Sequence, residues 1–466
     1  MKKHFMILLV LIAVLATVAL PSALASRSTN PDRMANQQSG RAECAVNLAD
    51  EGVSEVSFFH FGDLSGPYRP ISQPLVAGLT DAMAYFNSEE GGGGLCGAQI
   101  TMVYEDTGGD AAKATEYWAD FTSREGNDQP RIIFLYSSTD AENLREQAAE
   151  LKMPILLAAG SEKSLYGEDQ TPGWVFAAIP SYADQMGLFC EYVAENWEAM
   201  GMEGTPTIGH LSWNIAFGQS SDTAETRAYC ESLGVGYAGA EYFLPIGTPD
   251  LSGQLKILTD AGANIIYTTT LATGSSQVIR AIVGAGLQGQ ILVGGPNWIL
   301  DTSVYGLAGA DSDGVVGTLP YLWWDQLDNP GVQIVNNAWV TNRLSVATND
   351  EERTAAFLTR NIAYLTSWAL LDLWIDVMTR AINEAGSFEA VTGETLYNLL
   401  NAGYQYSAMQ GMVEYAFDAN TRSQTHAYVG AIDFVERDGQ VQPTIGPLTE
   451  LRELPDLRVG GADVPQ

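Results

Sequence analysis

The chain has 466 residues, and its 23 Lys and Arg against 56 Asp and Glu give a formal net charge of −33 at pH 7. So acidic a protein argues against nucleic acid and anionic lipid as partners. The length allows two or three domains.

The N-terminus predicts export. Lys2 and Lys3 precede an apolar run over residues 5–20, and residues 23–25, Ala-Leu-Ala, form a small-residue cleavage site. An uncleaved membrane anchor is the alternative, but the apolar run is short for a spanning helix. We therefore expect a signal peptide at 1–25 and a periplasmic or extracellular protein. No cysteine lies at the cleavage point, so the sequence gives no sign of a lipid anchor. Residues 26–50 are polar and are predicted to be a flexible lead-in.

Short apolar runs alternate with helical patterns over the first block of the chain. Strands are expected at 55–61, 100–104, 132–136, 154–158 and 175–179. Helices are expected through Leu75 to Phe86 and from Asp110. A third helix is expected to begin at Thr139, because Thr139 and Glu142 have the spacing of a capping box.

A second alternating block follows Pro180. Its expected strands lie at 207–211, 241–244, 264–268, 291–293 and 314–319, with helices around 186–197, 223–233, 251–258 and 275–285. Long helices at 332–344 and 361–385, a shorter one at 395–400, and strands at 413–417 and 427–434 complete the chain. Regular strand-helix alternation in two blocks predicts an α/β protein with two doubly wound, parallel-sheet lobes.

Four cysteines remain in an exported protein, an even number that favours disulfides over the alternative of free buried thiols. Three pairings are possible. We expect Cys44 with Cys96 and Cys190 with Cys230, because each pair then lies within one lobe.

Ser138 and Ser161 follow two strands that are expected to be neighbours and parallel. The carboxyl ends of such strands open into one crevice, and the helix after the first strand directs unpaired amides into it. The two hydroxyls could then hold a small anionic group, most naturally a carboxylate. The alternative is that both serines are only a helix cap and a turn residue.

No motif for catalysis, a metal or a cofactor is present. His60, His210 and His426 lie far apart and without metal-ligand spacing. The glycine pattern at 284–289 matches a dinucleotide motif, but it follows a helix and precedes a strand, the reverse of the required order. No carboxylate pair has spacing that marks general acid and base roles, so we expect no enzyme and no cofactor.

Together these features resemble a known family. An exported chain with two α/β blocks, a turn at Ser65-Gly66-Pro67 after the first strand and hydroxyls after the fourth is similar to the periplasmic solute-binding proteins of ABC importers, specifically the leucine/isoleucine/valine-binding family. The resemblance covers roughly 53–444 and rests on the order of these features. It implies a type I periplasmic binding protein fold, in which two lobes joined by three crossing segments close around a small amino-acid-like ligand and serve an ABC-transporter permease.

The resemblance also implies where the ligand binds. Ser138 and Ser161 match the hydroxyls that hold the ligand's carboxylate, with Ser137 and the backbone of Ala159 and Gly160 beside them.

Five further positions belong to the predicted site. Phe217 and Leu271 stand where the family usually or often has tyrosine, and Trp298 and Tyr68 could line an aromatic pocket or only pack the lobe rims. Asn297 occupies the position at which amino-acid binders carry an acidic residue for the ligand's ammonium group. An amide lacks that charge, so amides, urea-like compounds and organic acids become alternative ligands.

The resemblance places the crossing segments near Pro180, 320–325 and 417–420. We therefore predict lobe 1 at 51–180 and 325–416, lobe 2 at 181–324 and 417–450, and a C-terminal tail at 451–466. A monomer is expected. A ligand-sensing receptor module of the same fold is the alternative to an importer component.

Overall fold

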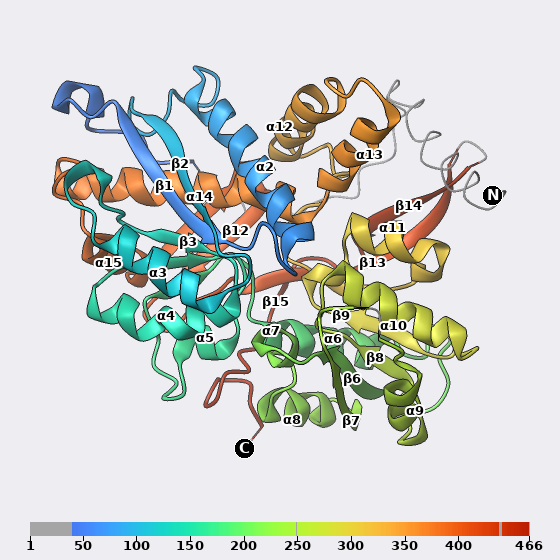
Figure 1. Cartoon of the computed structure of the whole chain (residues 1–466). Coiled ribbons are helices and arrows are strands. Elements are labelled where there is room, and N and C mark those ends of the chain that lie inside the picture. The colour runs from blue at the N-terminus through green and yellow to red at the C-terminus, as the bar shows by residue number, and fades with distance from the viewer. Residues whose placement is uncertain (1–39, 248, 438–439, 466) are drawn as a thin grey trace.

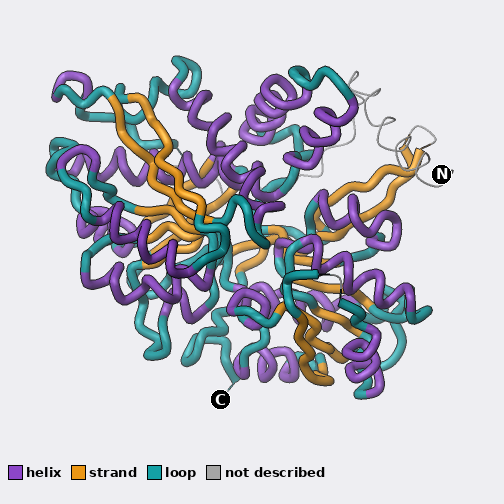
Figure 2. The backbone as a smooth tube through the Cα atoms, in the orientation of Figure 1, coloured by secondary structure: helices purple, strands orange, loops and turns teal. Residues whose placement is uncertain are grey.

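The computed structural model describes residues 40–247, 249–437 and 440–465. The expected signal peptide at 1–25 and residues 26–39 of the expected lead-in lie outside the described residues. The chain forms two lobes, each with its own group of strands and helices outside it (Figures 1 and 2).

The first lobe is built on five parallel strands in the order β2-β1-β3-β4-β5. These strands are β1 (Glu55–Gly62), β2 (Gln99–Asp106), β3 (Ile133–Leu135), β4 (Ile155–Leu157) and β5 (Val175–Ala177). The connecting helices are α2 (Arg69–Asn87), α3 (Ala111–Thr122), α4 (Ser138–Glu150) and α5 (Glu162–Tyr166). Strands β3 to β5 are buried along their whole length, which explains their continuous apolar sequences.

The second lobe is built on a mixed sheet in the order β14-β13-β10-β9-β8-β6-β7. Its parallel strands are β6 (Thr207–Trp213), β7 (Gly236–Phe243), β8 (Ile265–Tyr267), β9 (Leu292–Gly295) and β10 (Val316–Leu319). Its antiparallel strands are β13 (His426–Arg437), β14 (Gln440–Pro447) and the short β15 (Arg452–Glu453), which pairs with β13. Its helices are α6 (Tyr182–Asn196), α7 (Ala216–Gln219), α8 (Ala224–Ser232), α9 (Ser252–Asp260), α10 (Ala272–Gly284) and α11 (Thr302–Ala308).

The chain returns to the first lobe between β10 and β13. This return comprises α12 (Pro330–Trp339), a π-helical turn (Val340–Leu344), α13 (Asp350–Thr359), α14 (Ile362–Ala385), α15 (Gly393–Asn401), and the hairpin of β11 (Tyr404–Ala408) and β12 (Val413–Phe417). Helix α14 packs against α2 (Figure 1). Among the described residues α14 is the one helix long and apolar enough to cross a membrane, and 94% of its most apolar window is buried inside the protein, as in a core helix.

The remaining elements are short 3-10 turns. They are η2 (Leu48–Glu51), η3 (Gly126–Asp128), η4 (Asn297–Ile299), η5 (Gly309–Ser312) and η7 (Met409–Gly411). The chain passes between the two sheets at three points, after β5, after β10 and after β12. The fold is therefore the two-lobed α/β architecture that the sequence predicts.

The expected start of α4 is wrong by two residues. Ser137, not Thr139, is the N-cap, and its hydroxyl accepts a hydrogen bond from the Asp140 N–H at 3.2 Å. Glu142 therefore does not close a capping box, and its carboxylate is available for a contact elsewhere.

Both expected disulfides are present. Cys44 pairs with Cys96, and Cys190 in α6 pairs with Cys230 in α8, each with a Cα–Cα distance of 5.4 Å. These are the two predicted pairings, and each bridge lies within one lobe.

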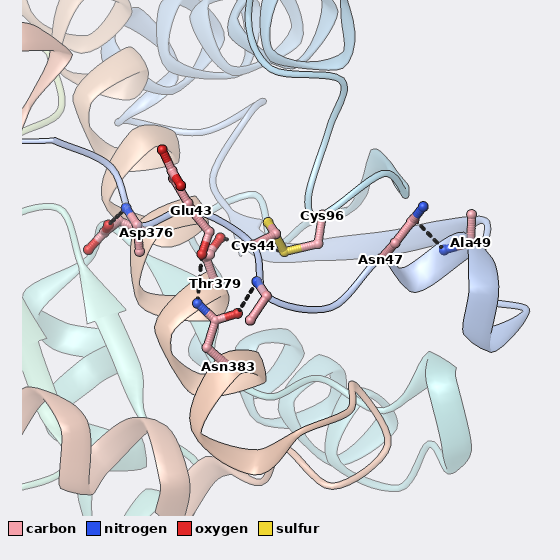
Figure 3. Close-up of a disulfide and its surroundings, with 10 residues drawn as sticks. Glu43, Cys44, Asn47, Ala49, Cys96, Asp376, Thr379 and Asn383 are labelled. Atoms are coloured by element: carbon pink, nitrogen blue, oxygen red, sulfur yellow. Dashed lines mark hydrogen bonds between the residues drawn. A yellow bond between two sulfur atoms is a disulfide. The ribbon is translucent and has the colours of Figure 1, made fainter.

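The first described residues are held against α14, whereas the sequence predicted a flexible lead-in. The Ala42 N–H donates to Asp376 Oδ1 at 2.7 Å, and the Ala45 N–H donates to Asn383 Oδ1 at 2.8 Å (Figure 3). Each bond joins residues more than 330 positions apart. The polar sequence of this segment gives no local sign of such long-range partners.

Candidate functional site

Ser138 and Ser161 lie at the carboxyl ends of β3 and β4, which are neighbours in the first sheet. Both are 4% exposed. The Ser138 hydroxyl donates to the Ala159 backbone oxygen at 3.3 Å, so it connects the loops after the two strands. Between them, Gly160 packs so closely that a Cβ there would lie 2.9 Å from Leu165, which explains a glycine at this position.

The Ser161 hydroxyl has two protein partners. It accepts the Ser164 N–H as the N-cap of α5 at 3.1 Å, and it donates to Glu142 Oε1 at 2.6 Å. Burial raises the pKa of Glu142, and the Ser161 hydrogen bond opposes that rise. Ser161 therefore has the capping role that the sequence left open, together with a contact to a carboxylate that the sequence did not predict.

Acidic groups lie near the start of α4. Burial and, to a smaller extent, the charge of Asp63 raise the pKa of the half-buried Asp140 to about 6, although the hydrogen bond with Ser137 opposes the rise. Burial, followed by the charges of Asp140 and Asp63, also raises the pKa of Tyr68, the N-cap residue of α2. The Tyr68 ring lies 6.1 Å from that of Tyr136. Tyr68 is therefore placed beside this acidic region.

Three aromatic side chains form a cluster in the second lobe. The Trp298 Nε1–H donates to the Tyr182 hydroxyl at 3.0 Å, and the Tyr182 and Phe217 ring centroids are 5.0 Å apart. Each of these three side chains is at most 7% exposed. Tyr182 is the first residue of α6, directly after the first crossing, and the sequence interpretation missed it. Leu271, at the N-cap position of α10, is buried too.

Asn297 is held by its backbone, not by its side chain. Its N–H donates to Gln185 Oε1 at 2.8 Å, and its carbonyl oxygen accepts from the Tyr321 hydroxyl at 3.5 Å. The residue is 0% exposed, and neither its Nδ2 nor its Oδ1 makes a hydrogen bond of good geometry among the described residues. The amide still acts on the buried Tyr321 hydroxyl, whose pKa is raised by burial and lowered by Asn297. A buried amide without partners costs free energy, and a bound group would remove that cost.

Asn297 and Trp298 line a cavity of about 20 Å³ where the two lobes meet. Its other described lining residues come from the first sheet, the crossing segments, the hairpin β11–β12 and helices α2 and α14: Leu75, Phe134, Ala158, Ala178, Ile179, Tyr321, Ile362, Thr366, Ser367, Leu370, Val413 and Tyr415. No Asp, Glu, Lys, Arg or His is among these lining residues. The cavity has room for about one water-sized group, and Asn297 is its one amide side chain.

The structure thus brings the predicted site residues together only in part. Asn297 and Trp298 share a cavity with Ala158, the residue before Ala159. The remaining predicted positions lie at strand and helix ends outside that lining: Tyr68, Ser137, Ser138, Ala159, Gly160, Ser161, Phe217 and Leu271. Within the described residues, no group of three or more His, Cys, Asp or Glu is placed to hold a metal ion.

Known proteins share this architecture. The solved structure of a branched-chain amino acid ABC transporter protein from Thermus thermophilus with bound valine matches with a TM-score of 0.65 and 16% identity, over 85% of this chain and 97% of that chain. A solute-binding protein from R. palustris in complex with 4-hydroxybenzoate matches with a TM-score of 0.64 and 15% identity, over 86% and 97% of the two chains. These similarities confirm the type I fold.

Sequence comparison identifies the family. The Leu/Ile/Val-binding protein homolog 2 of Brucella abortus (strain 2308) is 23% identical over 338 residues, which are 72% of this chain and 84% of the relative. A family model described as periplasmic binding protein matches residues 60–440, most of the chain. The chain therefore belongs to the periplasmic binding protein family, whose members are exported solute-binding components of ABC transport and not enzymes.

Proposed function

We propose that this chain delivers to an ABC-transporter permease a small organic acid whose other end is polar but uncharged. The observation that carries this proposal is Asn297, a fully buried amide whose two polar side-chain atoms have no partner among the described residues. An amide can donate to and accept from a hydroxyl or amide group of the ligand, but it supplies no charge for an ammonium group.

The acidic end of the ligand would bind the first lobe. The Ser138 hydroxyl and the first-turn amides of α4 lie at the carboxyl end of β3, where the helix dipole favours a negative charge. Ser161 would add a second hydroxyl by turning from Glu142 to the ligand. Ser137 and the backbone of Ala159 and Gly160 would complete this half of the site.

The body of the ligand would contact the aromatic cluster of Tyr182, Phe217 and Trp298, with Tyr68 and Leu271 at its edges. Aromatic walls bind flat, apolar groups well. The cavity in the described arrangement is far smaller than such a ligand, so the ligand would enter an open form, and the lobes of the closed complex would lie farther apart here than in the described arrangement.

Two related structures represent the competing ligand classes. Valine, bound to the Thermus protein, has a carboxylate and an ammonium group, whereas 4-hydroxybenzoate, bound to the R. palustris protein, has a carboxylate, an aromatic ring and an uncharged hydroxyl. Asn297 favours the second kind of ligand for this chain. A branched-chain amino acid remains the competing ligand, and it would need an acidic group from elsewhere in the cleft.

The lobe boundaries belong to the same proposal. We place the first lobe at 51–180 and 325–416 and the second at 181–324 and 417–450, with the protein acting as a monomer. The three passages of the chain between the sheets support this division.

Thermal unfolding of the purified mature protein with a panel of organic acids, amides, ureas and amino acids tests the proposal. A ligand that binds the folded state raises the unfolding midpoint, and we expect the rise with hydroxylated or amidated acids. Replacing both Ser138 and Ser161 with alanine should abolish that rise, whereas Ser123→Ala, at the exposed C-cap of α3, should leave it unchanged. A full rise in the double variant would contradict the assignment of the carboxylate end.

A further inference from the structure

A second and larger cavity lies within the second lobe. Its volume is about 400 Å³, within the range of small-molecule sites. It is lined by the amino ends of β9 and β10, at Leu292 and Val316, and by Ala431 of β13, which pairs with Val316. Strand β9 runs from Leu292 toward Asn297 in the cleft between the lobes. This cavity therefore lies at the opposite, amino-terminal end of the parallel strands.

The walls of the cavity are apolar and come from both sides of the sheet. Met200 and Met202 follow α6 on one side, while Ile279 and Ile282 project from α10 on the other. Methionine side chains are flexible and polarizable, and they make favourable contacts with aromatic rings. The walls therefore suit an apolar body, aromatic bodies in particular.

The rim carries three carboxylates, from Asp311, Asp313 and Asp433. Asp311 accepts a hydrogen bond from Gln288 at 3.4 Å, and Asp313 accepts the Phe434 N–H at 2.9 Å. No described Lys or Arg forms an ion pair with any of the three. The cavity lining contains no Lys, Arg or His among the described residues.

The carboxylates at the rim also repel one another. Burial and the charge of Asp313 raise the pKa of the half-buried Asp433, as expected for neighbouring like charges without a cation between them. A positive group at the rim would relieve this repulsion and would be complementary to the site.

We propose that this cavity is a second ligand site, and that it binds a small amphipathic cation of the arylalkylamine class. The ammonium group would lie between Asp313 and Asp433, and the apolar body would fill the space between the methionines and α10. The site is separate from the cleft between the lobes, so its occupancy does not depend on the transported solute.

Isothermal titration of the mature protein with phenethylamine tests the proposal, with 2-phenylethanol as the uncharged probe of nearly the same shape. We expect saturable binding of the amine and at least about tenfold weaker binding of the alcohol, because the alcohol has no charge to pair with the carboxylates. Absence of saturable binding of the amine, or equal binding of the alcohol, would overturn it.

Substitutions in the cavity test whether the amine binds there. The double variant Asp313→Asn/Asp433→Asn removes the charge, and Val283→Trp fills the apolar wall while leaving the carboxylates in place. Each should weaken binding of the amine at least about tenfold, the factor that corresponds to 1.4 kcal/mol. The exposed Glu231→Gln, on α8 of the same lobe, should have no effect.

Asn297→Leu distinguishes the two sites. It should leave binding of phenethylamine unchanged, because Asn297 lies in the cleft between the lobes. If Asn297→Leu abolished binding, or if the double aspartate variant bound the amine as tightly as the native chain, the amine would be binding elsewhere and the proposal would fail.

Discussion

In our proposal, Asn297 lowers the stability of the folded protein and contributes to ligand binding. Its side-chain amide is buried and unpaired, a state that costs about 1–3 kcal/mol for each unsatisfied group. Leucine has the same number of side-chain heavy atoms, branched at the same carbon, and no polar atoms. We therefore expect Asn297→Leu to raise the free energy of unfolding by about 1 kcal/mol and to abolish binding of the cleft ligand. Urea unfolding and titration calorimetry measure the two effects.

Asn264 offers a matched control for this prediction. Its Oδ1 accepts the Thr207 N–H at 2.8 Å and its Nδ2 donates to the Thr205 oxygen at 3.0 Å, so its amide is satisfied. Asn264→Leu should lower the free energy of unfolding, the opposite sign. A loss of stability in both variants would show that Asn297 has a partner within the folded protein.

Asp140 should oppose the acidic end of a ligand. Its pKa is raised to about 6, so the side chain is largely ionised at pH 7.5 and largely neutral at pH 5. We expect a carboxylate ligand to bind several-fold more tightly at pH 5, and Asp140→Asn to bind tightly at both values. Calorimetric titration at the two pH values measures this; a pH dependence that persisted in Asp140→Asn would assign it to another group.

For single residues, the sequence predicted those positions that depend only on the neighbouring sequence. Ser138 and Ser161 lie at strand ends because apolar runs stop directly before them. The hydrogen bond between Trp298 and Tyr182 joins residues 116 positions apart, and that between Ser161 and Glu142 joins the N-cap of α5 to helix α4. Neither has a local pattern, because each depends on how the elements pack.

The segment after β15 connects the two lobes. The Leu457 N–H donates to Asp184 Oδ1 in α6 at 2.9 Å, and the Val459 N–H donates to Glu162 Oε1 in α5 at 2.8 Å. Burial raises the pKa of Asp184 to about 7, with smaller increases from Asp456 and Glu162. This segment therefore depends on carboxyl groups that are costly to ionise.

The sign of the resulting pH dependence follows from linkage. The folded-state pKa of Asp184 lies above its unfolded value of about 4, so the folded protein binds the proton more tightly and loses stability as the pH rises from about 4 to about 7. Asp184→Asn keeps an acceptor for the Leu457 N–H and cannot ionise. We expect its unfolding free energy to fall less than that of the native chain across this range, as measured by urea unfolding.

The exposed Glu231→Gln provides the control for that measurement, because it removes one carboxylate from the same lobe. Its pH dependence should match that of the native chain. If Asp184→Asn showed the native slope as well, the loss of stability would arise from other carboxyl groups.

Elements were predictable where their sequence pattern was strong. The buried strands and the helices with apolar stripes agree with the expected ranges to within a few residues at most sites. Two of the missed elements have weak patterns: α13 begins with Asp350, Glu351 and Glu352, and β14 contains Pro443 and ends at Pro447. Such sequences form regular structure because a neighbouring element pairs with or packs against them, which local propensity does not reveal.

For the molecule as a whole, the order of strands and helices was sufficient to predict two lobes, because parallel strands need crossover helices. The three passages between the lobes were predicted from the family resemblance. We expect the relative position of the lobes to depend on the ligand. Helix α4 of the first lobe contacts α7 of the second, so the described arrangement is closed.

Closure should be visible in solution. We expect the free protein to populate an open form and a saturating cleft ligand to shift it to the closed one, with a decrease in the radius of gyration measured by small-angle X-ray scattering. Phenethylamine serves as the control, because it would bind within one lobe and leave the radius unchanged. A radius that is the same with and without the cleft ligand would contradict hinge closure.

The measurement that tests the central claim most directly is calorimetric titration of the mature protein with 4-hydroxybenzoate and with valine under the same conditions. We predict saturable binding of 4-hydroxybenzoate, whose carboxylate would reach Ser138 and whose hydroxyl would reach Asn297, and much weaker binding of valine. Tight binding of valine with none of 4-hydroxybenzoate would contradict the account, because it would require a negative charge for the ammonium group where the structure places the Asn297 amide.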